Sequence, residues 1–128
     1  MKRTVFYIRH QDDKERAAQQ QACERFAKKH GITAARTFAD ADSAHKPSRP
    51  GLKAMLQAAE RNELRRVVVH HPSQLSRSRA ERLAIYKQLQ ARHVELIHHL
   101  DDPATIKLAQ QILDDAIVLM EDQDEAGR

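Results

Sequence analysis

Imidazole and carboxylate side chains follow three apolar segments of this sequence. His10 follows the first segment, Asp40 and Asp42 follow the second, and His70 and His71 follow the third. The carboxyl ends of parallel strands meet at one edge of a sheet, where open α/β folds bind ligands. Side chains of these types could hold a divalent metal there, as in a hydrolase or nuclease. The spacing matches no known ligand motif, however, and five further histidines are scattered along the chain: His30, His45, His93, His98 and His99.

Arginines surround the third apolar segment, which suggests a second kind of chemistry, the binding of phosphate. Residues 1–100 carry 20 Lys/Arg and 10 Asp/Glu, whereas residues 101–128 carry 2 and 8, within a net charge of +4. A basic body suits a polyanionic partner such as nucleic acid, although the same charges could simply solvate helix surfaces. Several of the following residues could form one basic surface around the crevice: Arg61, Arg65, Arg66, Arg77, Arg79 and Arg82.

The segment Val67–Val69 runs into a polar loop that contains Pro72 and extends to Ser78. Three β-branched residues without polar alternation predict a strand buried on both faces, as in a parallel sheet covered by helices. The loop after such a strand faces the ligand crevice. It is therefore the expected position of a functional site.

Strands and helices are predicted to alternate along the rest of the chain, which favours a three-layer α/β fold. We expect a mainly parallel sheet of four to five strands flanked by helices. The loop between Asp40 and Gly51 is long enough to suggest function. The predicted order is a strand at Thr4–Ile8, a helix from about Ala17 to Lys29, a strand at Ile32–Phe38, a helix at Leu52–Asn62, a strand from Arg65 or Arg66, a helix containing Leu83 and Leu89, and a strand at Val94–Ile97.

A helix is predicted from Pro103 to about residue 121, and it differs from the others in its broad apolar surface. One side can pack on the body, and the other is expected to be covered by a partner helix in a homodimer or higher oligomer, or by the domain itself. Its apolar positions in steps of three and four are Ile106, Ala109, Leu113, Ala116 and Met120. We divide the chain into an α/β body at 1–100, this helix at 101–122, and an acidic, disordered tail at 123–128.

Composition limits the class of protein. A chain of 128 residues with 41% apolar and 31% charged residues is predicted to be a globular, rather polar domain. Cys23 is the single cysteine, and its helical spacing with Phe26 predicts a core position. No segment is long enough for a membrane span, so we expect a cytoplasmic protein without a cofactor and without a membrane partner.

Three segments together resemble the catalytic domain of the serine recombinases, the resolvase and invertase family. Tyr7-Ile8-Arg9 is similar to that family's Tyr-Ala-Arg-Val-Ser signature in strand one. Arg49-Pro50-Gly51-Leu52 is similar to its Arg-Pro-Gly-Leu segment, and Val67 to Ser78 resembles its Val-Val-Val…Leu-Asp-Arg-Leu-Ser-Arg-Ser stretch. The order and spacing agree over roughly residues 1–120, and the terminal helix resembles the family's dimerisation helix.

The resemblance implies a pocket in which a serine attacks a phosphodiester while arginines stabilise the charge that develops. Gln11 stands where the family has that serine, and its amide cannot form the phosphoester. Ser73 and Gln74 stand in place of an Asp-Arg pair. The matching positions that remain are Arg9, Asp40, Arg49 and Arg77, so the resemblance predicts a remnant pocket without an intact set of catalytic residues.

Three serines predicted in loops could in principle replace the nucleophile: Ser43, Ser73 and Ser76. Ser73 would lie on a different strand from the lost nucleophile, and the other two match ordinary loop positions. All three are better explained as hydrogen-bonding loop residues. Catalysis is therefore not expected.

The preferred hypothesis is a resolvase-like protein that has lost DNA cleavage and acts as an accessory, regulatory or DNA-binding partner in DNA recombination or mobile-element maintenance. Its partners would be DNA, a second copy of itself and an active recombinase. The residues expected to contact phosphate are Arg9, Arg49, Arg77 and Arg79. The alternatives are a metal-dependent hydrolase or nuclease and a pure protein-interaction module.

Overall fold

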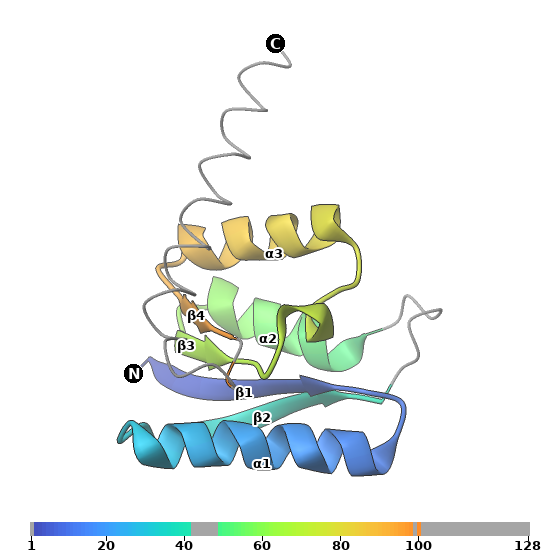
Figure 1. Cartoon of the computed structure of the whole chain (residues 1–128). Coiled ribbons are helices and arrows are strands. Elements are labelled where there is room, and N and C mark those ends of the chain that lie inside the picture. Colours follow the sequence, from blue (N-terminus) through green and yellow to red (C-terminus); the bar gives the residue numbers. More distant parts are fainter. Residues whose placement is uncertain (1, 42–48, 99, 101–128) are drawn as a thin grey trace.

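The computed structural model describes residues 2–41, 49–98 and 100. Strands and helices alternate along these residues, as the sequence predicts (Figure 1). The elements are β1 (Arg3–Arg9), α1 (Asp13–Lys29), β2 (Ala34–Asp40), α2 (Pro50–Glu60), β3 (Leu64–Val68), the short 3-10 helix η1 (Pro72–Gln74), α3 (Arg79–Ala91) and β4 (Glu95–Ile97).

The four described strands form one parallel sheet in the order β2-β1-β3-β4. Helix α1 lies on one face of the sheet, and α2 and α3 lie on the other (Figure 1). The predicted three-layer parallel fold is confirmed. Because every strand runs in the same direction, the ends of β1 and β2 meet at Arg9 and Asp40, which are partners in the register.

Strand β3, one of the two inner strands of the sheet, is buried on both faces, as its run of β-branched residues predicts. Val67, Val68 and Val69 are each fully buried. Val67 belongs to the core under α2 and α3, whereas Val68 packs with Phe6 and Phe26 under α1. Burial of an aliphatic side chain of this size contributes roughly 1.5–3 kcal/mol. This strand therefore anchors both layers at once.

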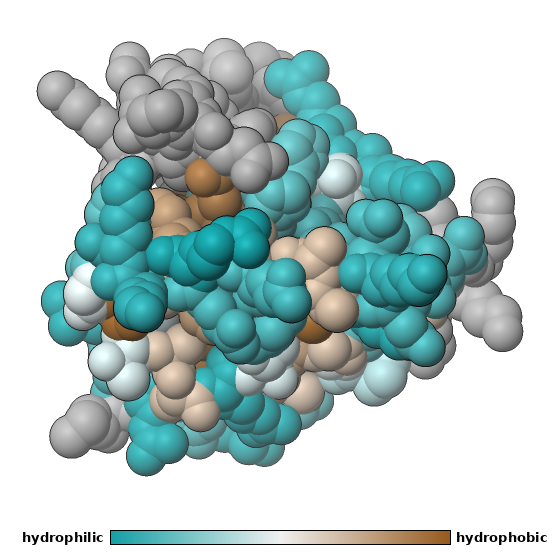
Figure 2. Space-filling model, turned by 60° about the horizontal axis from the view of Figure 1, so that its bottom comes forward, coloured by the Kyte–Doolittle hydropathy of each residue, from teal (hydrophilic) through white to brown (hydrophobic). Residues whose placement is uncertain are grey.

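Helix α1 is amphipathic, and its outer face is polar. Its N-terminus is capped by Asp12, whose side chain accepts a hydrogen bond from the backbone of Lys14, and its last turn carries Lys28 and Lys29. Gly31 follows with a φ of 64°, a conformation that glycine adopts without strain, and the helix ends at Lys29 as predicted. Figure 2 shows the α1 side of the molecule as a mainly hydrophilic surface with small, separated apolar areas.

The predicted core position of Cys23 is confirmed, since its side chain is fully buried. Burial raises the pKa of its thiol to about 12, with a smaller contribution from the negative charge of Glu24. The thiol therefore stays protonated near neutral pH and is a packing residue rather than a nucleophile.

Several element boundaries differ from the predicted ones, and α1 begins at Asp13 rather than near Ala17. Ile32 was expected to begin the second strand, but β2 begins at Ala34 and continues to Asp40. The backbone N–H of Ile32 instead donates to the carbonyl of Ala27 and closes the end of α1. Helix α2 begins at Pro50 rather than Leu52, because its first turn is capped from outside the helix.

Several predictions lie outside the described residues. They are most of the loop after β2 (42–48, including Asp42, Ser43 and His45), His99, the helix at 101–122 and the tail at 123–128. Within the described part of the chain, no helix is both long and apolar enough to cross a membrane.

Gly51 is expected to tolerate no side chain, because a Cβ atom there would lie 2.4 Å from the carbonyl oxygen of Ala39. Gly51→Ala should therefore lower the free energy of unfolding by about 1–3 kcal/mol, the usual cost of overpacking. Urea unfolding followed by circular dichroism measures this loss. Lys53→Ala, at an exposed position of the same helix, should change stability by less than about 0.5 kcal/mol. Equal effects of the two substitutions would contradict the close approach of α2 to β2.

Candidate functional site

The candidate site is built around the buried carboxylate of Asp40 at the end of β2, which is 3% exposed. Its Oδ1 accepts a hydrogen bond from the backbone N–H of Gly51 at 2.7 Å, and its Oδ2 accepts one from that of Leu52 at 2.9 Å. The Tyr7 hydroxyl donates to Oδ2 at 2.6 Å. Asp40 thus caps the N-terminus of α2 from a neighbouring strand, where a negative charge is favoured by the helix dipole.

The segment from Arg49 to Leu52 is explained position by position by this cap. Arg49 makes no side-chain cap of its own helix, and Pro50 occupies the first turn, where its missing N–H is not needed. Gly51 allows the helix backbone to reach the carboxylate, and Leu52 fills the core under the helix.

The Arg49 side chain is also buried, at 8% exposure, and it joins three parts of the chain. Its Nη2 donates to the Tyr7 hydroxyl and to the carbonyl of Gln74, both at 2.9 Å. Its Nη1 donates to the carbonyl of Leu75 and lies 3.5 Å from Oε1 of Glu81. The four terminal N–H groups are therefore engaged inside the protein, and Arg49 acts as a brace between β1 and the loop after β3.

Burial raises the pKa of Tyr7, and the hydrogen bond to Asp40 raises it further, while the positive charge of Arg49 opposes both. The phenol therefore stays neutral and bridges an anion and a cation. Asp40 and Arg49 thus avoid the large cost of unpaired buried charges, although the Nε of Arg49 is buried without a hydrogen-bond partner among the described residues.

The loop after β3 is held by Gln74, which is buried in η1. Its Oε1 accepts hydrogen bonds from the backbone N–H groups of His70 and His71, at 3.1 and 3.4 Å. The Ser73 hydroxyl is exposed and lies 2.9 Å from Nδ1 of His71. Gln74 was expected only as the replacement of a pocket arginine, but its role in this structure is to shape the loop.

Arg9 is positioned through its backbone at the end of β1. The Gln19 side chain of α1 accepts from the Arg9 N–H at 2.9 Å and donates to the Arg9 carbonyl at 3.1 Å. On the side of β1 that faces β3, these two hydrogen bonds take the place of a strand neighbour. The backbone of Arg9 is therefore held by α1. In the described part of the chain, no side-chain hydrogen bond or ion pair uses the guanidinium of Arg9 or of Arg77.

The three arginines lie close enough to influence one another electrostatically. The pKa of Arg9 is lowered by partial burial first, then by the positive charge of Arg49, and by that of Arg77 to a smaller extent. Like charges that repel in an empty site are relieved by an anion placed between them. The carboxyl ends of β1, β2 and β3 thus bring together four predicted residues: Arg9, Asp40, Arg49 and Arg77.

Gln11 is exposed and lies in the turn between β1 and α1. The turn is fixed by His10, whose N–H donates to the Asp40 carbonyl and whose own carbonyl accepts from Arg16. The interpretation of Ser73 and Ser76 as hydrogen-bonding loop residues fits their contacts, because the Ser76 hydroxyl donates to Glu81 at 3.0 Å.

The six arginines around β3 do not form one surface. Arg61, Arg65 and Arg66 lie at the beginning of β3, and Arg66 pairs with Glu95 at 3.2 Å. Arg77, Arg79 and Arg82 follow its other end. The six arginines therefore cannot all share one surface, because the two ends of a strand lie at opposite ends of the sheet, and only Arg77, Arg79 and Arg82 remain candidates for a common basic surface.

The hypothesis of a metal site at the strand ends is not supported. Among the described residues, no group of three His, Cys, Asp or Glu side chains is arranged to hold a metal ion. Both oxygens of Asp40 already accept hydrogen bonds from Tyr7 and α2, and Nδ1 of His10 accepts one from the backbone of Asp12. Asp42 lies outside the described residues.

Three positioning residues were missed by the sequence reasoning, namely Tyr7, Gln19 and Glu81. Gln19 carried a detectable signal, because it shares the buried helical face of Cys23 and Phe26 and is the polar member of that face. Glu81 stands three residues after Ser78, the spacing of a capping motif. Tyr7 was noted only as part of the Tyr7-Ile8-Arg9 segment, without a role of its own.

These features define an α/β domain with a cationic site at the carboxyl end of a parallel sheet, supported by a buried carboxylate. The family model of the resolvase N-terminal domain matches residues 4–123. The chain therefore belongs to the family of resolvase N-terminal domains, which have the serine recombinase catalytic fold.

Solved structures of the same fold support this assignment. The N-terminal catalytic domain of TP901-1 integrase matches with 19% identity and a TM-score of 0.76, over 99% of this chain and 100% of that one. A resolvase family site-specific recombinase from Streptococcus pneumoniae matches with 19% identity and a TM-score of 0.71, over 99% and 93%. Identities at this level show the fold alone.

The chain spans 64% of a further match, the product of the first open reading frame in transposon ISC1904 from Sulfolobus solfataricus P2. That match has 21% identity and a TM-score of 0.64, over 73% of this chain. No curated protein sequence gives a significant match.

Tyr7→Phe should lower the free energy of unfolding by about 1–3 kcal/mol, because the Asp40 carboxylate and the Arg49 guanidinium each lose a buried hydrogen-bond partner. The pKa of Tyr7 is raised in the folded state, so the contribution of its hydroxyl is complete below the ordinary tyrosine pKa of about 10 and declines above it. The deficit of the variant should therefore be constant near neutral pH and shrink in alkaline solution. Denaturant unfolding at several pH values measures it.

Tyr86→Phe is the matched control, since Tyr86 is buried but makes no hydrogen bond through its hydroxyl among the described residues. It should cost less stability than Tyr7→Phe at neutral pH. Equal losses would show that the hydroxyl of Tyr7 does not bridge the pair.

Proposed function

We propose that this protein binds the phosphodiester backbone of duplex DNA at the carboxyl end of its sheet without cleaving it, as an accessory or regulatory partner in DNA recombination. One observation carries the proposal. Arg9 ends β1 and Arg77 follows the 3-10 helix after β3, at the same end of the parallel sheet, and among the described residues their guanidinium groups pair with no carboxylate. A phosphate is the ligand that such a pair accommodates best.

The arginines of the site have different roles in the proposed binding of DNA. The guanidinium of Arg49 donates its hydrogen bonds to Tyr7 and to the loop after β3. It therefore positions the site and does not contact DNA. Arg9 and Arg77 provide the phosphate contacts, and exposed Arg79 at the start of α3 extends them. Contacts of this kind fix position on the duplex without reading its sequence.

The absence of cleavage rests on the resemblance to the serine recombinases together with the chemistry of the residues in place. Gln11 occupies the position of the family's nucleophile, and an amide forms no phosphoester. Gln74 is committed to the backbone of His70 and His71, and Ser73 supplies neither the acid nor the cation of the family's Asp-Arg pair. A bound phosphodiester would therefore meet cations but no attacking group.

We further propose that the helix at 101–122 joins the protein to a second copy or to an active recombinase. Its apolar positions recur in steps of three and four, as in helices that pair along one face. Pairing would double the number of arginine sites on one DNA duplex and so increase its binding by avidity.

Duplex binding should depend on Arg9 and Arg77 and on salt. Fluorescence anisotropy with a labelled duplex should give an affinity that falls as salt rises, because each neutralised phosphate releases counterions. Arg9→Ala with Arg77→Ala should weaken binding at low salt by about tenfold or more and reduce the salt slope by roughly two. Each removed arginine accounts for one phosphate contact.

Arg25→Ala with Lys28→Ala is the matched control, because it removes the same charge from the exposed face of α1. It should bind nearly as the unmodified protein does. Equal weakening by both double variants would reduce the effect to net charge, and no binding of the unmodified protein even at low salt would favour the protein-interaction module instead.

Incubation with supercoiled DNA should yield neither strand breaks nor a covalent protein–DNA adduct. The reaction is quenched with detergent and analysed by gel electrophoresis, with an active serine recombinase on its own site as the positive control. A detergent-stable adduct formed by the unmodified protein would overturn the non-cleaving assignment while leaving the DNA contact in place.

A further inference from the structure

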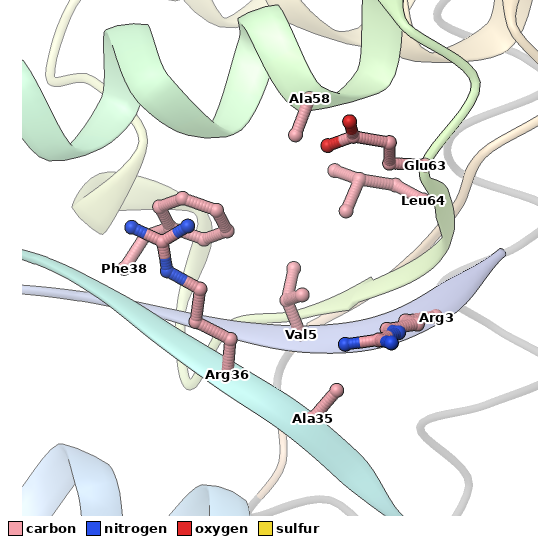
Figure 3. Close-up of a pocket in the computed structure, with 8 residues that line it drawn as sticks. All are labelled: Arg3, Val5, Ala35, Arg36, Phe38, Ala58, Glu63 and Leu64. Carbon is pink, nitrogen blue, oxygen red and sulfur yellow. The ribbon is translucent and has the colours of Figure 1, made fainter. Parts of the chain in front are cut away.

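A second candidate site lies at the opposite edge of the sheet, on the face covered by α2. A cavity of about 360 Å³ opens there between β1, β2 and the end of α2 (Figure 3). It involves Arg3, at the beginning of β1, whereas Arg9 at the other end of that strand belongs to the site described above. The two positions are separated by six strand residues, about 20 Å. The cavity is therefore independent of the proposed DNA site.

The inner wall of the cavity is apolar and rigid. Its lining includes Val5, Phe38, Ala58 and Leu64, which are buried members of the core under α2 and α3. They come from β1, β2, α2 and β3, so four elements fix the shape of the wall. A pocket of a few hundred cubic ångströms with such a wall has the size and character of a small-molecule site.

The rim of the cavity is charged, with two arginines and one glutamate. Arg3 and Arg36 approach from the sheet, and Glu63 lies across the cavity from Arg36 (Figure 3). The ion pairs between described residues involve none of the three. The rim thus carries a net positive charge that the described part of the protein leaves uncompensated.

Arg36 is held in place by an aromatic contact. Its guanidinium carbon lies 4.3 Å from the centre of the Phe38 ring, a cation–π geometry. The contact orients the guanidinium at the cavity mouth, so less side-chain freedom is lost when an anion binds. An exposed arginine without such support would be a weaker ligand-binding group.

We propose that this cavity binds a small organic anion, one carboxylate or phosphate group on an apolar body the size of a single ring. The anionic group pairs with Arg36 and Arg3 at the rim, and the apolar body contacts Val5 and Leu64. Glu63 disfavours a second negative charge at the far side and favours a hydrogen-bond donor there. The ligand class is thus a monoanionic amphiphile.

The test is an NMR titration of the full chain with benzoate and with methyl phenyl phosphate, two monoanions that separate the carboxylate from the phosphate. Inorganic phosphate and benzyl alcohol supply the charge and the ring separately. At least one of the two complete probes should give saturable shifts at Val5, Ala58 and Leu64 and bind about tenfold or more tightly than either half. Absence of saturable shifts with both complete probes would overturn the proposal, as would shifts centred on Arg9 and Arg77.

Two variants are expected to change the affinity for the anion in opposite directions. Arg36→Ala should weaken binding by about tenfold or more, since a charge-assisted hydrogen bond is lost. Glu63→Gln should strengthen it, because a like charge is removed from the rim without loss of volume. Arg25→Ala on α1 is the control and should leave binding unchanged. Weakened binding in Glu63→Gln, or unchanged binding in Arg36→Ala, would overturn the assignment.

Discussion

The carboxylate of Asp40 is the constraint on which the site depends. One side chain accepts hydrogen bonds from the first turn of α2 and from Tyr7, and through Tyr7 it is linked to Arg49 and the loop after β3. A buried charge of this kind is tolerated only when its partners are all present, so the elements must assemble together. The positions of β2, α2 and the loop after β3 are thereby coupled.

This coupling separates the residues that support the site from the exposed residues around it. Asp40 and Arg49 are engaged in contacts that the fold itself requires, whatever residue stands at position 11. Gln11 and Ser73 are exposed and carry little of the packing. A substitution at either of these positions therefore leaves the buried framework in place. The guanidinium groups of Arg9 and Arg77 lie beside this framework and form no ion pair among the described residues.

The two proposed anion sites lie at opposite ends of the parallel sheet and differ in character. At the carboxyl end of the sheet, arginines lie beside polar loops. This arrangement would suit a solvated phosphate of a DNA backbone. At the other end, Arg3 and Arg36 stand over an apolar wall, which suits an anion with an apolar body. Because strands of one direction separate the two ends by their full length, both can exist in one domain without sharing a residue.

The sequence by itself determined the alternation of strands and helices, the burial of Val67–Val69 and the polar loop that follows them. These features are local, since they depend on periodicity, β-branching and glycine or proline at the turns. The resemblance of the sequence to the serine recombinases also predicted that Arg9, Asp40, Arg49 and Arg77 belong to one pocket. Only the tertiary structure decided that Arg49 points inward, that Gln74 shapes its loop, and that Arg61 and Arg77 lie at opposite edges of the sheet. The direction of a long polar side chain depends on partners 25 to 42 residues away in the chain, and no local pattern records them.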